Sequence, residues 1–380
     1  NTYTQERQYT EAARVYVKIL ALDPENDAAR LELANLYYRA ALSATSTQNR
    51  LNFWQRCASV LQEYFKKEKN PSKELQAKYL EALLGSRQYT EAAELGRKFQ
   101  KLEPNSPLAF RAIANGYFNE KKYQLAVDNF KKIDTLEFDD YRLLGLAYRQ
   151  LKKDTLAART WEEGLKDTTL STTIRSVFLG QIGDVWMGQK MYERAADAYM
   201  RRIELDTMAV GSYINYAQCL DQLDRHEKAA AALKKAIQIN KNYPPAYVNL
   251  GFTYFQMQDF DEGRRMFEIA IKIIDTAEFK YKIDLADSYR MIAISIMAEK
   301  KSTDSTSIEK WKNAITYLKK SLKYKEDGSQ THLNLAKCYQ NLYTLELIDS
   351  WKDLAIKAYE RALKLDPKLI EAKKQLENLR

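Results

Sequence analysis

A period of 34 residues runs along much of the chain and constrains its fold more than any other feature. Small residues at Ala92 and Ala126 are 34 positions apart, as are those at Ala195, Ala229 and Gly263. In most copies a larger apolar residue follows four positions later, which places both side chains on one face of a helix. A fixed period of this length is typical of proteins built from stacked repeats. We therefore expect one array of similar units rather than two or three separate domains.

Each period holds a second set of anchors upstream of the first. Leu250 and Gly251 precede Tyr254, and the same order of large, small and aromatic residue recurs in other copies. This spacing predicts two amphipathic helices per period, A and B, with a polar turn between them. Gly (12) and Pro (7) are scarce, which argues against the many tight turns of a sandwich, barrel or propeller.

These anchors resemble the tetratricopeptide repeat (TPR) family, whose helix-turn-helix unit has conserved aromatic, small and apolar positions. One copy matches the family pattern in order at Tyr247, Leu250, Gly251, Tyr254, Gly263, Phe267 and Ala270. The resemblance extends over essentially the whole chain. It implies an all-α fold, a right-handed α-α superhelix in which the A helices line an inner face.

The resemblance sets a register of repeats. We expect an incomplete first repeat at 1–26 that contributes only a B helix, with its A helix upstream of Asn1, and a capping helix at 368–380. The complete repeats between them are expected at 27–72, 73–106, 107–137, 138–175, 176–209, 210–243, 244–285, 286–328 and 329–367.

Three of these repeats are longer than the others: 27–72, 286–328 and 329–367. Their extra residues are expected between helix A and helix B: after Tyr37, from Ser302 to Ser307, and as a longer connection from Thr344 to Ser350. Such insertions would share one edge of the array. Two interpretations stay open, a tolerated loop or a contact with a partner.

The residue counts exclude several kinds of chemistry. Only 2 His and 3 Cys are present, too few for a multi-His metal site or a disulfide framework. His226 and His332 take positions that are aromatic in other copies, so we expect them to pack rather than to catalyse. No phosphate-binding glycine motif occurs. We therefore expect no catalytic residue, no cofactor and no metal, and no enzymatic activity.

The net charge of +9 is spread evenly along the chain, so a nucleic-acid partner is not favoured. No apolar run reaches the length of a membrane span, and no signal-peptide pattern opens the sequence. We expect a soluble protein of the cytoplasm or, if an upstream signal has been removed, of the bacterial periplasm or cell envelope.

Asparagines recur at one position of the A helices, just before the packing pair. Asn215, Asn249 and Asn334 occupy it. Because an amide both donates and accepts hydrogen bonds, a ladder of such residues could grip a peptide backbone. The alternative is that Asn is simply common at this position of the repeat.

Further groove candidates fall into two groups on the same helices. The first group favours an apolar ligand stripe and comprises Ile214, Gln218, Val248, Phe252 and Phe255. The second favours an acidic or polar ligand and comprises Arg111, Asn115, Asn119, Arg142 and Arg149.

These observations favour a non-catalytic scaffold that binds a peptide or protein segment in the groove of the superhelix. Two other functions stay open: a regulatory or substrate-recruiting arm of a larger enzyme or envelope complex, and an RNA-binding helical repeat. The sequence names neither the partner nor the oligomeric state.

Overall fold

The structure is a computed structural model that describes residues 2–68, 70–274, 281–299 and 303–380. At the N-terminal end, side chains are described from Gln8 onward. Asn1 of the predicted first repeat and Ser302 of one predicted insertion lie outside the described residues. The described residues form twenty α-helices and no strand. Contacts between helices divide the chain into two compact units, Asn1–Val185 (unit 1) and Trp186–Arg380 (unit 2).

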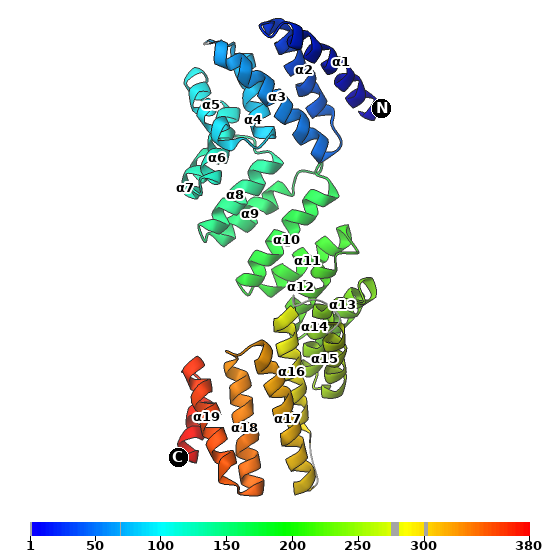
Figure 1. Cartoon of the computed structure of the whole chain (residues 1–380), viewed down its shortest axis with the longest axis vertical. Helices are drawn as coiled ribbons and strands as arrows, with labels where there is room; N and C mark the ends of the chain where they lie inside the picture. The colour runs from blue at the N-terminus through cyan, green and yellow to red at the C-terminus, as the bar shows by residue number, and fades with distance from the viewer. Residues whose placement is uncertain (1, 69, 275–280, 300–302) are drawn as a thin grey trace. The chain divides into compact units, whose positions relative to one another are not determined.

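Unit 1 is a succession of helices joined by short turns (Figure 1). They are α1 (Thr2–Leu22), α2 (Asp27–Ser43), α3 (Thr47–Lys67), α4 (Lys73–Gly85), α5 (Tyr89–Leu102), α6 (Pro107–Asn119), α7 (Tyr123–Phe130), α8 (Phe138–Gln150), α9 (Asp154–Gly164) and most of α10 (Thr172–Gly188).

Unit 2 continues the same pattern from the last residues of α10. Its helices are α11 (Tyr192–Leu205), α12 (Val210–Asp221), α13 (His226–Ile239), α14 (Pro244–Gln256), α15 (Phe260–Ile274), α16 (Lys282–Ala298), α17 (Asp304–Tyr324), α18 (Ser329–Glu346), α19 (Asp349–Leu365) and α20 (Ile370–Leu379).

Helices in each unit pack mainly against their neighbours in sequence. In addition, alternate helices touch one another: α4 with α6 and α6 with α8 in unit 1, and α12 with α14, α14 with α16 and α16 with α18 in unit 2. Contacts restricted to neighbouring repeats are typical of a solenoid. The predicted fold class, an all-α array of helix-turn-helix repeats, is therefore confirmed.

Six turns between an A and a B helix share one backbone conformation, which explains the scarcity of glycine. Each has a non-glycine residue in the left-handed region: Arg87, Lys121, Lys152, Lys190, Asp224 and Gln258, with φ between 56° and 63°. In the first of them the amide of Gln88 donates to the carbonyl of Leu83 at 2.9 Å and that of Arg87 to Leu84 at 3.0 Å. This is the Schellman pattern, which satisfies the last carbonyls of the A helix.

Among the described residues, much of the extra sequence of the three long repeats lies in longer helices. Helices α2, α16, α18 and α19 have 17, 17, 18 and 17 residues, and α3 and α17 have 21 each. Regular helices such as α12 and α14 have 12 and 13. The connection expected from Thr344 to Ser350 is mostly helical, since α18 runs to Glu346 and α19 begins at Asp349. Residues such as Leu345 and Glu346 favour helix, and the lengthened partner helix supports them by packing.

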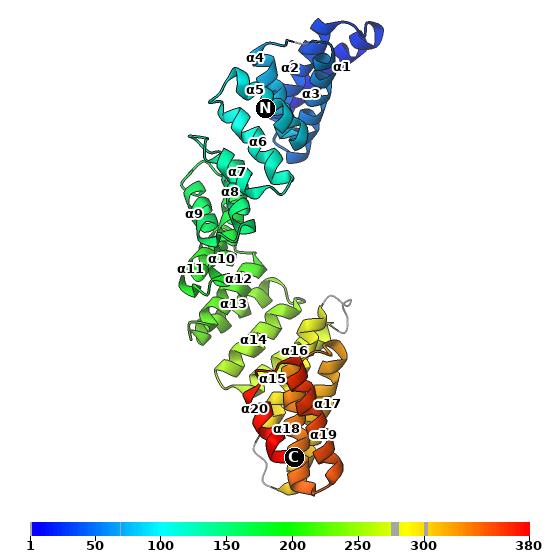
Figure 2. The same cartoon turned by 90° about the vertical axis from the view of Figure 1, so that its left-hand side faces the viewer.

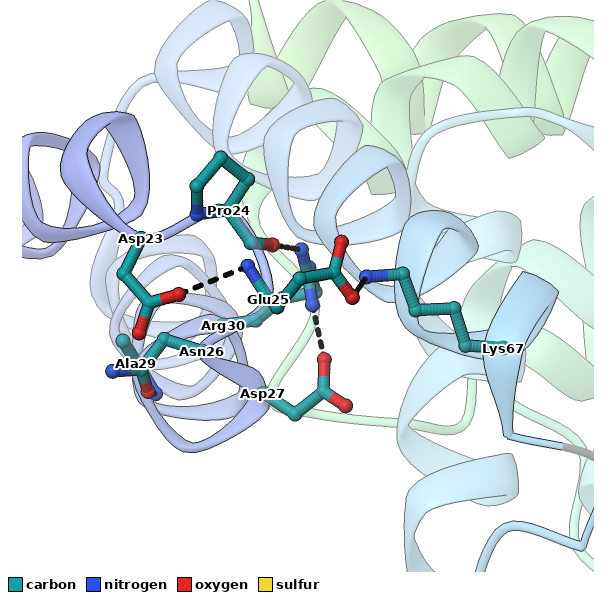
Figure 3. Close-up of polar contacts among 8 residues, drawn as sticks. All are labelled: Asp23, Pro24, Glu25, Asn26, Asp27, Ala29, Arg30 and Lys67. Carbon is teal, nitrogen blue, oxygen red and sulfur yellow. Dashed lines mark hydrogen bonds and ion pairs between the residues drawn. The ribbon is translucent and has the colours of Figure 1, made fainter.

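A turn between a B and an A helix is held by side chains, as Figure 3 shows for α1 and α2. Asp23 Oδ1 accepts from the amide of Glu25 at 3.3 Å, and Asn26 Oδ1 accepts from that of Ala29 at 2.9 Å. The second bond caps the start of α2. Arg30 donates to both Asp27 and the carbonyl of Pro24.

The last helix, α20, lies against α19 (Figure 2). It buries Ala372, Leu376 and Leu379 and leaves Lys373 and Lys374 exposed. This amphipathic division suits a helix that covers apolar surface at the end of a stack.

Helix backbones approach most closely where the sequence places small residues. A methyl group added to Gly116 of α6 would lie 2.3 Å from the methyl carbon of Ala93 in α5. At Gly251 the added carbon would lie 2.8 Å from the ring of Phe267, which is fully buried. Glycine is thus required at these contacts by the distance between the helices.

We predict that Gly116→Ala lowers the free energy of unfolding by about 1 to 3 kcal/mol, because an overpacked contact with a backbone-anchored methyl forces the helices apart. The control is Gly211→Ala, where the added carbon meets nothing within 4 Å. It should leave stability unchanged within about 0.5 kcal/mol or raise it slightly, because Ala favours helix. Urea unfolding followed by circular dichroism measures both, and equal losses would contradict the prediction.

Candidate functional site

A groove of about 430 Å³ opens on unit 2 across the A helices α10, α12 and α14. We call it the unit-2 groove. It is lined by Met187, Tyr192, Gln218, Asp221, Gln222, Asn249, Phe252 and Gln256. Four of these carry amide side chains and three are apolar or aromatic. Asp221 is the one charged residue among the described lining residues.

The amides of the groove connect neighbouring repeats. Gln218 Nε2 donates to Asn249 Oδ1 at 2.8 Å, and Asn249 Nδ2 donates to the carbonyl of Pro245 at 2.7 Å. An amide side chain has two donor hydrogens and two acceptor lone pairs. Asn249 therefore keeps one donor and one acceptor for a ligand, and its orientation is fixed by the two bonds it already makes.

Asp221 joins three helices at the edge of the groove. Its Oδ2 accepts from the hydroxyl of Thr253 at 2.6 Å, and its Oδ1 lies 2.9 Å from Nδ1 of His226. Thr253 is fully buried on α14 and His226 is the first residue of α13. The carboxylate is thus bonded within the protein, and the groove presents little free charge to a ligand.

The other unit 2 candidates are placed differently. Ile214 and Val248 are buried in the core, so they support the groove from beneath and do not line it. Phe255 packs edge to face on Phe260 and Phe267, with ring centroids 5.2 and 5.6 Å apart. Asn215 is half-buried on α12, one turn before Gln218.

The asparagine ladder does not continue beyond two neighbouring helices. Asn334 lies half-buried on α18, and the equivalent position of the intervening α16 is Met291, which is buried. Asn215 and Asn249 lie on adjacent A helices, so these two rungs remain as a prediction.

Unit 1 has a pocket of about 490 Å³ on its own A helices, and it brings together three of the predicted residues, Arg111, Asn115 and Arg142. Its lining residues come from α2 to α6 and from the start of α8: Tyr38, Leu42, Trp54, Glu81, Leu84, Gly85, Tyr89, Leu108, Arg111, Asn115, Glu137, Asp139, Asp140 and Arg142.

The arginines of the unit 1 pocket are already paired. Arg111 donates from Nε and Nη2 to the carboxylate of Asp140 at 2.8 to 3.0 Å and also lies 3.0 Å from Glu137. Asp140 is only 1% exposed, so this pair is structural and ties α6 to the start of α8. Arg142 donates to Asp139 at 2.9 Å. Both guanidinium groups are therefore engaged within the protein, and the expected preference of this group for an acidic or polar ligand stays a prediction.

Two predicted residues lie outside both cavities. Asn119 is exposed at the end of α6. Arg149 Nη1 donates to Gln181 Oε1 of α10 at 2.7 Å, a bond between neighbouring repeats. Asn115, although it lines the pocket, donates back to the carbonyl of Arg111 at 2.8 Å.

Sequence reasoning missed several lining residues of the unit-2 groove. Gln222 and Gln256 follow Asn215 and Asn249 by seven positions, which is two helical turns. Residues at this spacing lie on one face of a helix, so the spacing alone would have found them. Met187 and Tyr192 gave no such signal, because they come from the end of one helix and the start of the next.

The three thiols lie in the interior of the helix packing. Cys57, Cys219 and Cys338 are all buried, and burial raises the pKa of each thiol to about 12. His332, at the start of α18, places Nε2 at 3.2 Å from the carbonyl of Glu326.

Two features are absent from the described residues. No group of three or more His, Cys, Asp or Glu side chains there is placed to hold a metal ion. None of the helices described has the length and apolar character needed to span a bilayer.

Family models match several of these helix pairs. A model described as TPR repeat matches residues 222–258. Two models described as tetratricopeptide repeat match residues 3–42 and residues 244–275 and 350–369.

A curated relative is the DnaJ homolog subfamily C member 7 homolog of Dictyostelium discoideum, 22% identical over 342 residues. The match covers 86% of this chain and 57% of that protein, so the chain spans just over half the length of this relative.

Solved structures with a similar arrangement are TPR proteins and a complex. The C-terminal part of a TPR repeat-containing protein from Cytophaga hutchinsonii is 18% identical, with 79% of this chain and 99% of that chain covered and a TM-score of 0.49. A chain of the APC/C hetero-tetramer Cut9–Hcn1 is 15% identical, with 99% and 74% covered and a TM-score of 0.49. YrrB, described as a TPR protein with an unusual peptide-binding site, is 20% identical, with 50% and 96% covered and a TM-score of 0.42.

We predict that Asp221→Ala lowers the free energy of unfolding by about 1 to 2 kcal/mol, because the buried hydroxyl of Thr253 loses its charged acceptor across the helix interface and keeps only the carbonyl of Asn249 in its own helix, at 3.1 Å. The control is Asp224→Asn in the neighbouring turn, where the side chain is 96% exposed and Asn also tolerates the left-handed backbone; its effect should stay within about 0.5 kcal/mol. Equal stability of Asp221→Ala and the parent protein in urea would contradict the structural role.

We predict that none of the three cysteines reacts with iodoacetamide in the folded protein at pH 8. With a thiol pKa of about 12, only about one thiol in ten thousand is ionised, so alkylation should be at least about a thousandfold slower than for an exposed thiol. Unfolding in urea should release all three. Mass spectrometry counts the adducts, and rapid labelling of the folded chain would show that a cysteine is accessible.

Proposed function

The chain contains tetratricopeptide repeats, and from that premise we propose that it is a non-catalytic scaffold that binds an extended, largely uncharged segment of a partner protein in the unit-2 groove. The observation that carries this proposal is the combination of amide and apolar side chains on the faces of adjacent A helices. This groove combines a residue at the predicted asparagine position, Asn249, with an open cavity.

The amides suit the backbone of an extended peptide. Asn215, Gln218 and Gln222 follow one face of α12 at spacings of three and four, and Asn249 and Gln256 lie on the facing side of α14. Such groups can pair with peptide N–H and C=O groups without selecting particular side chains. The bond from Gln218 to Asn249 holds the two rows in register.

The apolar residues supply contact area for the side chains of the ligand. Phe252 is half-buried and packs edge to face on Phe267 with ring centroids 5.3 Å apart, so its ring is held in place before a ligand arrives. Met187 and Tyr192 line the same groove. A fixed aromatic ring beside a flexible methionine is typical of sites that bind apolar side chains.

The charge of the groove supports an uncharged ligand. Asp221 is bonded to Thr253 and His226, so a cationic ligand gains no free carboxylate there. A strongly acidic ligand would meet the same carboxylate at close range. A segment with little net charge therefore loses least on binding.

The binding test begins with selection of peptides from a displayed random library by the folded chain. A photo-crosslinking residue is then installed at Gln222, which lines the groove, and in a second protein at Lys228, which is exposed on α13. Selected peptides should crosslink at position 222 and not at 228. Crosslinking at 228 alone, or no selected peptide, would overturn the proposal.

We predict that Asn215→Ala and Gln222→Ala each weaken binding of a selected peptide about five- to tenfold, the loss of one hydrogen bond at a partly buried site. Neither side chain has a hydrogen-bond partner among the described residues, so the midpoint of urea unfolding should not change. Asn249→Ala should instead lower both affinity and stability, because Asn249 bonds to Gln218 and Pro245. Isothermal calorimetry and urea titration separate the two effects, and unchanged affinity in all three variants would contradict the ladder.

A further inference from the structure

The turn between α18 and α19 exposes two large apolar side chains. Leu347 is 76% exposed and Ile348 is 47% exposed. We call these two residues the α18–α19 tip. They sit at the end of one of the lengthened helix pairs, so the longer helices carry them further along the hairpin than a regular repeat would. Neither side chain contributes to the core, and their exposure needs another explanation.

The backbone of the tip is as unusual as its side chains. Leu347 has φ 53° and ψ 33°, in the left-handed region. Elsewhere among the described residues, each non-glycine residue with positive φ is polar or charged, as at Lys152, Asp224 and Gln258. A branched apolar residue is disfavoured in this conformation. Local packing does not explain the choice of leucine, because its side chain is exposed.

The tip rests on a rigid base. The indole Nε1 of Trp351 donates to Glu346 Oε2 at 2.6 Å, and the ring stacks on Tyr339 with centroids 5.8 Å apart. Lys312 of α17 pairs with the same carboxylate, Glu346, at 2.8 Å. These contacts fix both sides of the turn, so the exposed side chains are held in place before any partner arrives.

The tip is bordered by acidic side chains that lack a partner. Asp349 and Asp353 are exposed on the first turns of α19. Neither carboxylate meets a basic side chain within the described part of the chain. The surface is therefore apolar at its centre and acidic beside it, and a complementary surface would be apolar with lysine or arginine at its rim.

Unit 1 carries a surface of that kind, at the ends of α3 and α5 and the start of α4. We call it the α3–α5 pocket. It has a volume of about 440 Å³ and is lined by Phe65, Glu68, Pro71, Gln76, Leu95, Lys98, Lys101 and Leu102. Leu102 is 50% exposed. The pocket lies at the junction of a B and an A helix and is separate from the A-helix pocket of unit 1.

The rim of the α3–α5 pocket is basic. Lys98 and Lys101 are exposed and one helical turn apart on α5, and neither pairs with a carboxylate among the residues described. The nearby Lys73 is already paired with Glu103 at 2.9 Å. Glu68 is the acidic group on the opposite side, and its Oε1 accepts from the amide of Asn70 at 2.8 Å. Two lysines are thus available to a ligand.

We propose that the α18–α19 tip of one molecule docks in the α3–α5 pocket of a second copy of this chain. Leu347 and Ile348 would contact the apolar lining, while Asp349 and Asp353 would face Lys98 and Lys101. The two surfaces differ, so the contact is head-to-tail and can repeat from copy to copy. The proposal is independent of peptide binding in the unit-2 groove.

The first test is the molar mass of the folded chain over a range of concentrations, measured by light scattering after gel filtration. A contact made by two apolar side chains and two pairs of opposite charges is expected to be weak, so the molar mass should rise with protein concentration at about 10 to 100 μM. Leu347→Gly removes the apolar side chain and suits the left-handed backbone, so it should raise the concentration needed for association at least tenfold without loss of stability. Gln258→Gly, in another left-handed turn of unit 2, is the matched control and should associate like the parent protein.

The second test reverses the charges. A chain with Lys98→Glu and Lys101→Glu, and a chain with Asp349→Lys and Asp353→Lys, should each be monomeric alone, because like charges then meet at every contact. Mixed in equal amounts, they should associate, because each tip then faces a pocket of opposite charge. Restoration on mixing also shows that both variants are folded.

Three results would overturn the proposal. The parent chain could stay monomeric throughout the concentration range. It could associate with Leu347→Gly having no effect, which would place the contact elsewhere. The two charge-reversed chains could stay monomeric when mixed while circular dichroism shows both to be folded.

Discussion

The structure depends on how closely two helix backbones can approach, both within a hairpin and between neighbouring repeats. Where α6 crosses α5, Gly116 leaves no room for even one methyl group beside Ala93. Where α14 faces α15, the ring of Phe267 occupies the volume that a side chain at Gly251 would fill. Small residues set the distance and aromatic rings fill the remaining space. Because this pairing recurs with the period of the sequence, each hairpin adopts a similar geometry, and the rows of A-helix side chains fall into register.

That recurrence is why the fold class could be predicted from the sequence. The pattern of small and aromatic residues indicates which faces of the helices pack together. The family models and the contacts between helices agree with that pattern. The long repeats were harder to predict. Polar residues around Thr344 suggested a long connection, whereas α18 continues to Glu346 there, because two lengthened helices support each other by packing.

The candidate site was only partly predictable. Sequence spacing determines which residues share one face of a helix, but it does not determine which side chains form hydrogen bonds with one another. The spacing placed Gln218, Asn249 and Phe252 in one groove, as the structure has them. It could not show that Arg111 is paired with the buried carboxylate of Asp140, since that pairing depends on side-chain orientations in two different helices. For the same reason the bonds from Asp221 to Thr253 and His226 had no signal in the sequence.

The six left-handed turns have a mechanical consequence. Each one places a residue with a full side chain where glycine would be relaxed, so each of these six hairpins contains a small local strain. In an array whose helices touch mainly their neighbours, this strain is not shared along the chain. A pulling force should therefore open the array one hairpin at a time, with the strained turns yielding first, and the remaining repeats should stay folded on either side.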